Sequence, residues 1–392
     1  DIIPLDATRQ WRSWEAEGKQ IELLEAEEQR LGLRIKVKEA LTKARLFGGA
    51  GIYIGTKDTN PSQPLQPERM GQGGIQYLAV LPMRQLSVVG LEDDPASPRF
   101  GLPKMYQLAG GSTGVQFIHP SRIVAFIGAP LPDSQLTGNA AQWGWGDSVL
   151  TSCRDAITNA DATIANVASM VFEAKIDVVK IPEFMDNIGD KAYRARVMER
   201  LQLAAIAKGV NGMLVLDASE EHETKQLSFG NLPEITDRFM QMASGAADIP
   251  ATRLLGQSPA GLSATGESDT RNYYDRIRAV QELEIGPAMQ VLDECLIRSA
   301  LGNRPPEVHC EWRSLWQSTP EQKATTGKTV ADTIVALNNT KLWPIDVLTQ
   351  AATTMLVEHG AAPGLESAMR DYFENGGNAP SDTPDGEGDM ND

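Results

Sequence analysis

The chain has 392 residues, enough for two or three compact units, and its 36 Lys plus Arg against 52 Asp plus Glu give a net charge of −16. This charge argues against a protein that grips nucleic acid by neutralising many phosphates, because tight phosphate binding needs a basic surface. It is compatible with a protein that touches DNA without holding it, but the charge alone favours an ordinary acidic soluble protein.

The three cysteines, Cys153, Cys295 and Cys310, are spaced too widely for C-x-x-C metal-ligand pairs. We therefore expect neither a zinc site nor a disulfide framework, and each cysteine is expected to be a small buried apolar residue of a protein in a reducing cytoplasm. No apolar run has the length of a membrane span, so no membrane partner is expected. The N-terminal segment DIIPLDATRQ lacks the pattern of a signal peptide.

The first third of the chain predicts a helix followed by short strands. Residues 7–47 place apolar side chains among charged neighbours, and the glycines of LFGGAGIYIG (46–55) end the helix and begin a strand. Residues 56–74 are rich in Pro, Gly and Gln and predict a loop. Four further strands, each bounded by turn residues, are expected at 75–82, 85–90, 104–110 and 122–128. This pattern predicts a mainly antiparallel sheet.

A long helix is expected over residues 146–175, which contain no proline and no internal glycine. Its apolar residues follow one another at alternating spacings of four and three, which predicts a narrow packing seam. The predicted seam consists of Cys153, Ile157, Ala160, Ile164, Val167 and Val171. A second amphipathic helix begins at Pro233. Between the two helices we expect an apolar stretch at 176–182, a helix at 188–208, a strand at 212–217 and a charged strand or loop at 220–229.

The segment LLGQSPAGLSATGES (254–268) is expected to be a loop, and a helix is expected from Glu267 to about residue 300. Gly286-Pro287 lies inside that helix and predicts a kink. A strand at 307–316 and helices at 319–338 and 344–359 follow. The last residues are polar, acidic and rich in Gly and Pro, so we expect them to be disordered.

Motifs for catalysis are weak. The glycine spacing of the 254–268 loop resembles a P-loop, but Leu262 and Glu267 stand where the phosphate-binding lysine is required. The four histidines are far apart in the sequence, and His119 is expected to be structural. No nucleophile elbow and no H-E-x-x-H motif occurs. We expect no catalytic residue, no metal and no cofactor; a metal-dependent nuclease or an NTPase is kept as the alternative.

From Gly256 to Gly266 this loop contains no charged residue, so it cannot clamp phosphate. Its glycines make it flexible, which suits either close approach to a moving polyanion or a plain surface connection. The loop consists of Gly256, Gln257, Ser258, Pro259, Ala260, Gly261, Leu262, Ser263, Ala264, Thr265 and Gly266.

The flanks of this loop carry a resemblance to a known family. The segment IPATRLLGQSPAGLSATGESDTRNYYDRI (249–277) resembles the signature of tailed-bacteriophage portal proteins. Four shorter segments agree in order: DATRQWRSW (6–14), ARLFGGAGIYIG (44–55), HPSRIVAFIG (119–128) and WGDSVL (145–150). The resemblance extends from the N-terminus to about residue 300, and more weakly beyond.

The resemblance implies a portal fold of the α+β class, with wing, stem, clip and crown regions. Its expected boundaries are wing 1–146, first stem helix 147–174, clip 175–230, second stem helix 231–247, tunnel loop and long kinked wing helix 248–305, wing strand 306–317, crown helices 318–375 and a disordered acidic tail 376–392. The loop Gly256–Gly266 would project towards DNA.

The resemblance also implies a function and partners. Portal subunits form a ring, usually a dodecamer, at one capsid vertex, and double-stranded DNA is packaged and ejected through it. Terminase large subunit, major capsid and scaffold proteins and a head–tail adaptor are the implied partners, in the virion and, during assembly, in the host cytoplasm. A head–tail adaptor ring is a further alternative, because it shares the ring geometry.

Overall fold

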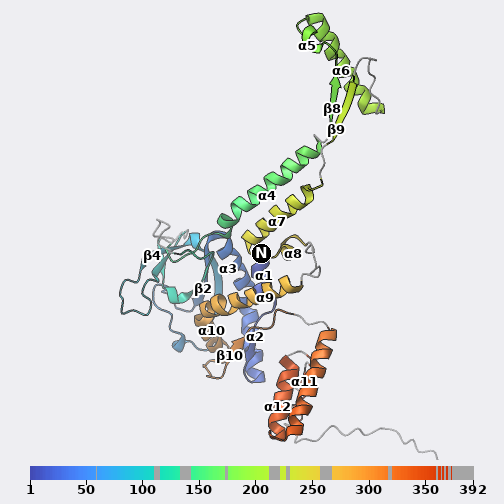
Figure 1. Ribbon diagram of the computed structural model, residues 1–392. Helices are drawn as coiled ribbons and strands as arrows, with labels where there is room; N and C mark the ends of the chain where they lie inside the picture. Colours follow the sequence, from blue (N-terminus) through green and yellow to red (C-terminus); the bar gives the residue numbers. More distant parts are fainter. Residues whose placement is uncertain are drawn as a thin grey trace, which may run out of the picture. The chain divides into compact units, whose positions relative to one another are not determined.

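The computed structural model describes residues 1–372 except residue 59 and the stretches 110–114, 133–142, 173–174, 212–220, 227–229, 257–266, 317–319, 359–360, 363, 366–367 and 370–371. The chain divides into two compact units, Asp1–Arg313 and Ser314–Asp392. The first unit combines long helices with antiparallel sheets, so the chain belongs to the α+β class, as the sequence predicts (Figure 1).

Three helices and a strand occupy the region where the sequence predicts one helix. They are α1 (Ile2–Arg9), β1 (Ser13–Glu15), α2 (Gly18–Leu31) and α3 (Leu33–Phe47). Gly32 separates α2 from α3 with a φ of 61°, a left-handed conformation that glycine adopts without steric cost. β1 pairs antiparallel with β10 (His309–Glu311), which lies near the C-terminal end of the first unit in the sequence. Periodicity does not detect such a distant partner.

Two antiparallel sheets follow. The first has the strand order β3-β2-β7, from β2 (Gly49–Thr56), β3 (Ile75–Pro82) and β7 (Ile123–Ile127). The second has the order β4-β5-β6, from β4 (Leu86–Leu91), β5 (Pro103–Leu108) and β6 (Gln116–Ile118). β2, β3, β4, β5 and β7 lie within a few residues of the expected strands, whereas β6 was not expected. Helix α3 packs against β2 and β3, so the first sheet is covered by the helical layer.

Glycines in β2 allow a tryptophan to lie against the strand. A Cβ atom at Gly49 would overlap the ring of Trp145, which is almost fully buried. The Trp145 Nε1–H donates to the carbonyl of Leu86 at 3.3 Å. Trp145 thereby joins the apolar cluster under the second sheet, with Leu86, Val88, Tyr106, Ile118 and Ile123.

Helices α4 (Val149–Phe172) and α7 (Leu232–Ala247) lie side by side as a helical hairpin (Figure 1). Between them the chain forms β8 (Lys175–Lys180), α5 (Phe184–Asn187), α6 (Lys191–Asn211) and β9 (Glu221–Gln226). β8 and β9 pair antiparallel, with Lys175 opposite Gln226. The strand expected at 212–217 lies outside the described residues.

After α7 the chain forms the short helix α8 (Ala251–Leu255) and resumes at α9 (Glu267–Val280). A π-helical turn (Gln281–Ile285) joins α9 to α10 (Gly286–Leu301) directly before the expected kink at Gly286-Pro287. Because Pro287 has no N–H to donate, a widened turn before it is a favourable solution. The strand expected at 307–316 is limited to β10, three residues long.

The second unit contains two long helices, α11 (Pro320–Thr340) and α12 (Ile345–Glu358), which pack on each other near the predicted positions. Val330 and Leu348 are buried, whereas Leu342 and Trp343 in the intervening turn are exposed. In the part of the chain that the structure describes, none of the helices is long and apolar enough to cross a membrane. The acidic residues 376–392 lie outside the described part.

Candidate functional site at the base of the 257–266 loop

Both flanks of the loop contact one buried carboxylate. Asp6 of α1 is completely buried. Arg253 of α8 donates from Nε to Asp6 Oδ2 at 3.1 Å and from Nη2 to Oδ1 at 2.9 Å. The hydroxyl of Tyr273 in α9 donates to Oδ2 at 2.9 Å. A bidentate guanidinium–carboxylate pair fixes both distance and orientation, so α8 and α9 are held on α1 by the same side chain.

Tyr273 remains a hydrogen-bond donor at neutral pH. Burial raises its pKa, and the adjacent Asp6 carboxylate raises it further. The phenol therefore keeps its proton and can neutralise part of the charge density on Asp6. Arg253 is partly exposed, and its pKa is raised by the hydrogen bonds to Asp6.

The turn between α7 and α8 is fixed by polar contacts. Asp248 ends α7 with a positive φ of 62°, and its carboxylate forms an ion pair with Arg276 of α9. The Ser244 hydroxyl donates to the carbonyl of Ile249. Arg45 of α3 donates to the carbonyl of Ala247 at 3.2 Å. These contacts define where the chain leaves α7 before it enters the loop.

A hollow of about 570 Å³ lies at this turn, bordered by residues of α7, α8 and α9. Its lining is mainly polar and includes Asp237, Gln241, Asp269 and Asn272. Within the described residues, no three His, Cys, Asp or Glu side chains gather into a metal-binding group. The base of the loop is thus built from structural ion pairs, with polar groups around an open hollow.

Helices α4 and α7 meet through small side chains. Cys153 and Ala160 of α4 are buried, and the Cys153 thiol donates to the carbonyl of Ala246 in α7 at 3.1 Å. The buried and half-buried residues described in α4 lie three or four apart: Val149, Cys153, Ala156, Ala160, Thr163 and Val167. Small residues at these positions let the two helix backbones approach closely.

Larger apolar side chains lie beside this seam and remain exposed in the single chain. On each helix they are spaced by seven residues, so they form one line along the helix surface. We call these lines the α4 stripe and the α7 stripe. The exposed fractions are Leu150 51%, Ile157 50% and Ile164 44% in the α4 stripe, and Ile235 44% and Met242 58% in the α7 stripe.

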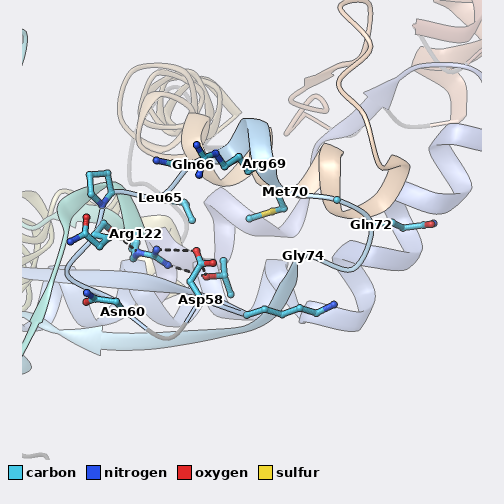
Figure 2. A pocket seen from close by; sticks show the side chains of 14 residues that line it. Asp58, Asn60, Leu65, Gln66, Arg69, Met70, Gln72, Gly74 and Arg122 are labelled. Atoms are coloured by element: carbon cyan, nitrogen blue, oxygen red, sulfur yellow. Dashed lines mark hydrogen bonds and ion pairs between the residues drawn. The ribbon is translucent and has the colours of Figure 1, made fainter.

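A second hollow, of about 740 Å³, lies beside the loop that joins β2 to β3 (Figure 2). Arg122 is buried in its wall and donates to the Gln63 carbonyl at 2.8 Å, to Thr56 Oγ1 at 2.9 Å and to Asp58 Oδ2 at 3.1 Å. The arginine of the HPSR segment is therefore an internal support for this loop.

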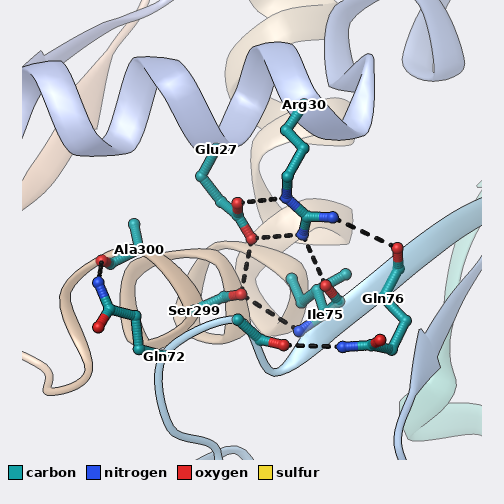
Figure 3. Close-up of polar contacts among 8 residues, drawn as sticks. Glu27, Arg30, Gln72, Ile75, Gln76, Ser299 and Ala300 are labelled. Atoms are coloured by element: carbon teal, nitrogen blue, oxygen red, sulfur yellow. Dashed lines mark hydrogen bonds and ion pairs between the residues drawn. The ribbon is translucent and has the colours of Figure 1, made fainter.

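The other end of that loop is held on α10 by a polar network (Figure 3). Ser299 accepts from the backbone N–H of Ile75 at 3.2 Å and donates to Glu27 Oε1 at 2.6 Å. Arg30 donates to Glu27 and, at 2.6 Å, to the carbonyl of Ile75. Supports at both ends give the β2–β3 connection a defined position.

A sequence profile described as "Phage portal protein" matches residues 1–336. This match covers most of the chain and contains every element of the first unit, including the base of the loop. The chain belongs to the phage portal protein family. The resemblance inferred from segment 249–277 is confirmed.

Named relatives extend the comparison. The chain is 41% identical over 387 residues to a protein of Caulobacter sp. (strain RHG1) named "Anti-CBASS protein Acb1", covering 95% of this chain and 61% of that protein. A protein of the same name from Sphingomonas paeninsulae is 37% identical, with 94% and 60% covered. The chain thus spans about three fifths of the length of these relatives. An uncharacterized protein of Haemophilus influenzae is 34% identical, with 84% and 74% covered.

The chain was also compared with solved structures, among them a chain of a GTA particle neck and a phage portal protein. The chain in "Neck of native GTA particle computed with C12 symmetry" has a TM-score of 0.49 at 13% identity, with 86% of this chain and 83% of that chain covered. A crystal structure of an HK97 family phage portal protein from Corynebacterium diphtheriae has a TM-score of 0.32 at 10% identity, with 69% and 79% covered.

The portal-family structure places the predicted site residues unequally. Of the predicted tunnel loop only Gly256 is described; it ends α8 with a φ of 69°, and residues 257–266 lie outside the described part. In the predicted seam, Cys153 and Ala160 are buried and Val167 is half-buried. The side chain of Val171 lies outside the described part.

Ile157 and Ile164 require a correction at the level of the single chain. Both are about half exposed and lie beside the seam, where the smaller Ala156 and Thr163 take the inner positions. The four-three spacing identifies an apolar stripe but does not distinguish its two edges. The edge that packs inside the hairpin is the one whose side chains are small.

The three cysteines are free thiols: Cys153 and Cys295 are buried, as expected, and Cys310 is half-buried. His119 has the structural role expected of it. Its Nδ1 lies 2.8 Å from the Ser121 hydroxyl and accepts from the Ser121 backbone N–H at 3.2 Å. Burial lowers its pKa, in keeping with a neutral acceptor in the turn before β7.

Sequence reasoning missed the Asp6–Arg253–Tyr273 contact, although a signal was present. The segments that resemble portal proteins contact one another in the fold. Segment 6–14 supplies Asp6 to segment 249–277, and the glycines of segment 44–55 accept Trp145 of segment 145–150. β2 of segment 44–55 pairs with β7 of segment 119–128. The shared signature is therefore largely a set of mutual contacts within the first unit.

Proposed function

We propose that this chain is the subunit of a ring-shaped portal at one vertex of a phage or phage-like capsid, through which double-stranded DNA is packaged and ejected. The role is structural rather than enzymatic. Family membership supports the proposal, and the observation that carries it is the pair of uncovered apolar stripes on the α4–α7 hairpin.

Two different stripes on one hairpin suit a closed ring. A head-to-tail contact joins one patch on a subunit to a different patch on its neighbour, and it closes when the rotation per subunit divides the circle. The α4 stripe (Leu150, Ile157, Ile164) and the α7 stripe (Ile235, Met242) are two such patches. Covering them would stabilise the subunit contact by about 25 cal/mol for each Å² of apolar surface removed from water. We propose that each α4 stripe packs against the α7 stripe of the next subunit.

The charge of the chain supports a conduit over a clamp. Each subunit carries a net −16, so a ring would repel the phosphates of DNA. Exposed residues of α4 include Asp155, Asn159 and Asp161, which are short and polar or acidic. A channel lined by such residues would offer few places where DNA could be held.

We propose the regional roles that the family resemblance implies. Residues 1–146 form the wing with the helix of 248–305 and the strand of 306–317, and the helices within 147–174 and 231–247 form the stem. Residues 175–230 form the clip, the docking face for terminase and later for a head–tail adaptor. Residues 256–266 form the tunnel loop and 318–375 the crown. Capsid and scaffold proteins would contact the assembled ring in the host cytoplasm and in the virion.

Particle mass with negative-stain imaging tests this proposal. Twelve subunits of 42.5 kDa would give a particle of about 510 kDa with a central hole. Concentration should be varied, because ring proteins can also be isolated as monomers. A compact particle near 42.5 kDa at every concentration would contradict the ring.

The relatives named Acb1 supply a second candidate, an anti-CBASS activity. This chain matches about three fifths of each of those proteins, so their name refers to a longer sequence than the part that matches. Infection of a CBASS-carrying host, with and without expression of this chain, separates the candidates. If the chain is only a portal subunit, its expression should not change the phage yield from the CBASS-carrying host. An improved phage yield would favour the second candidate.

A further inference from the structure

Asp6 binds α8 and α9 at the two places where the chain leaves for, and returns from, residues 257–266. Arg253 precedes Gly256 by three positions, and Tyr273 lies in the second turn of α9. We infer that Asp6 is a positioning residue that fixes the two ends of the 257–266 segment relative to each other and couples them to α1. The meaning of this coupling for DNA passage rests on the proposed function, whereas the coupling itself does not.

We call the contact of Asp6 with Arg253 and Tyr273 the clamp, and its geometry makes it stiff. Asp6 Oδ2 accepts from both Arg253 and Tyr273, and Oδ1 accepts from the second guanidinium nitrogen of Arg253. The carboxylate is buried, so water does not compete with these donors for its oxygens. Charged hydrogen bonds in such surroundings are short and directional. Displacing α8 would therefore strain the bond to α9, and the reverse holds as well.

The helix that carries Asp6 is itself anchored. Arg34 of α3 donates to the carbonyls of Thr8 and Arg9 at 2.8 and 2.6 Å. Gln281, in the π-helical turn after α9, donates to the carbonyl of Ala7 at 2.8 Å. The clamp thus connects α8 and α9 through α1 to the helical layer of the first unit.

The chemistry of Asp6 also explains why one residue serves both ends. Only a carboxylate offers two acceptor oxygens to a guanidinium while still accepting from a phenol. An asparagine at this position would present an N–H to Arg253 and lose one of the two arginine bonds. A substitution of Tyr273 by Phe removes the hydroxyl and leaves the arginine pair in place.

Amide hydrogen exchange on the full chain tests the clamp, with α10 as the internal reference. We expect Asp6→Asn to accelerate exchange in α8 and in the first half of α9 together, by about tenfold, because Arg253 loses its charged partner and one of its two hydrogen bonds. Tyr273→Phe should give a smaller rise that again appears in both helices. Arg34→Ala is the matched control: it frees the end of α1 and should leave α8 unchanged.

Two outcomes overturn the inference. One is faster amide exchange in only one of the two helices, α8 or α9, in the Tyr273→Phe variant. This variant is the milder change and keeps the test usable if Asp6→Asn does not fold. The other is an equal rise in α8 for Arg34→Ala. DNA packaging by the same variants separates the two levels. If the variants show faster exchange in both α8 and α9 but still package DNA normally, the clamp is supported and a role of the 257–266 segment in DNA passage is contradicted.

Discussion

Arg12 is a buried cation that connects three distant parts of the first unit. It lies 3.0 Å from Glu28 Oε1 and 2.6 Å from Asp293 Oδ1, and its guanidinium lies over the rings of Trp11 and Trp14 at 5.4 and 4.9 Å. Burial alone would lower the pKa of Arg12, but the adjacent Asp293 carboxylate outweighs burial and the pKa is raised. The arginine therefore stays charged, and its removal would leave two carboxylates without their partner.

Arg12→Ala is expected to lower the free energy of unfolding by about 3–5 kcal/mol, the cost of breaking a buried ion pair from one side. Urea denaturation of the full chain measures it. The exposed pair of Arg154 and Asp155 supplies the control, because Arg154→Ala should change stability by less than about 0.5 kcal/mol. Equal losses in the two variants would contradict the role assigned to Arg12.

Glu27 gives a pH-dependent contribution to stability. Burial alone would raise its pKa, but hydrogen bonds from Arg30 and Ser299 outweigh burial and hold the pKa below 4.5. A carboxylate with a depressed folded pKa stabilises the fold above its unfolded pKa, and this contribution is lost as the pH falls through the folded value. Glu27→Gln should thus destabilise at pH 7, and its difference from the parent should shrink below about pH 4.5.

Urea midpoints measured between pH 3 and pH 7 test this expectation. Glu25→Gln, an exposed position on the same helix, is the matched control and should follow the parent at every pH. A constant offset between Glu27→Gln and the parent would show that Glu27 acts through packing rather than through its charge.

At the scale of elements, the α4–α7 hairpin has a tight inner seam and two outer stripes. The exposure of Ile164 changes what a charge at that position should do. Ile164→Asp is expected to leave the free energy of unfolding of the single chain within about 0.5 kcal/mol, because the side chain is already 44% exposed. The same charge should weaken ring formation, since it would lie in an apolar contact between subunits.

Sedimentation velocity at several concentrations measures this effect. Asn166→Asp, an exposed position on the same helix outside the stripe, is the charge-matched control and should assemble normally. Ala160→Leu should behave in the opposite way, losing about 1–3 kcal/mol of chain stability by overpacking the seam. Normal rings from Ile164→Asp would exclude the α4 stripe from the subunit contact.

Much of the element order could be predicted from the sequence, because helices such as α4 and α7 and strands such as β3 carry strong periodicity. The division at Gly32 was missed, since charged and apolar residues continue the helical pattern on both sides of it. The pairing of β1 with β10 and the contact of Asp6 with Arg253 join residues far apart in the chain. Local pattern carries no information about such partners, and the resemblance to portal proteins pointed only to the segments that contain Asp6 and Arg253.

At the scale of the whole molecule, the acidic charge predicts weak contact with DNA. The intact ring is expected to bind duplex DNA more weakly than about 10⁻⁴ M at physiological salt, because few phosphates could be neutralised. Fluorescence anisotropy measures this, and a strong decrease of affinity with salt would contradict a channel that repels phosphate.

The loop provides the matching functional prediction, which comes from its sequence. Gly261→Val should stiffen the 257–266 segment and impair DNA packaging while ring assembly stays intact. Filled-particle counts from complementation of a portal-deficient phage measure it. Normal filling would remove the loop from the mechanism of packaging and leave it as a plain connection.

The pairing of β1 with β10 has a consequence for biosynthesis. Asp6, Arg12 and Trp14 are made long before their partners Arg253, Asp293 and Cys310, which lie in the C-terminal part of the first unit. Until those residues are made, the N-terminal segment has only its nearby partners, such as Glu28 for Trp11 and Arg12 and Arg34 for the carbonyls of Thr8 and Arg9. Closure of the first unit is therefore a late step in the folding of that unit, completed only when the strand around Cys310 is available.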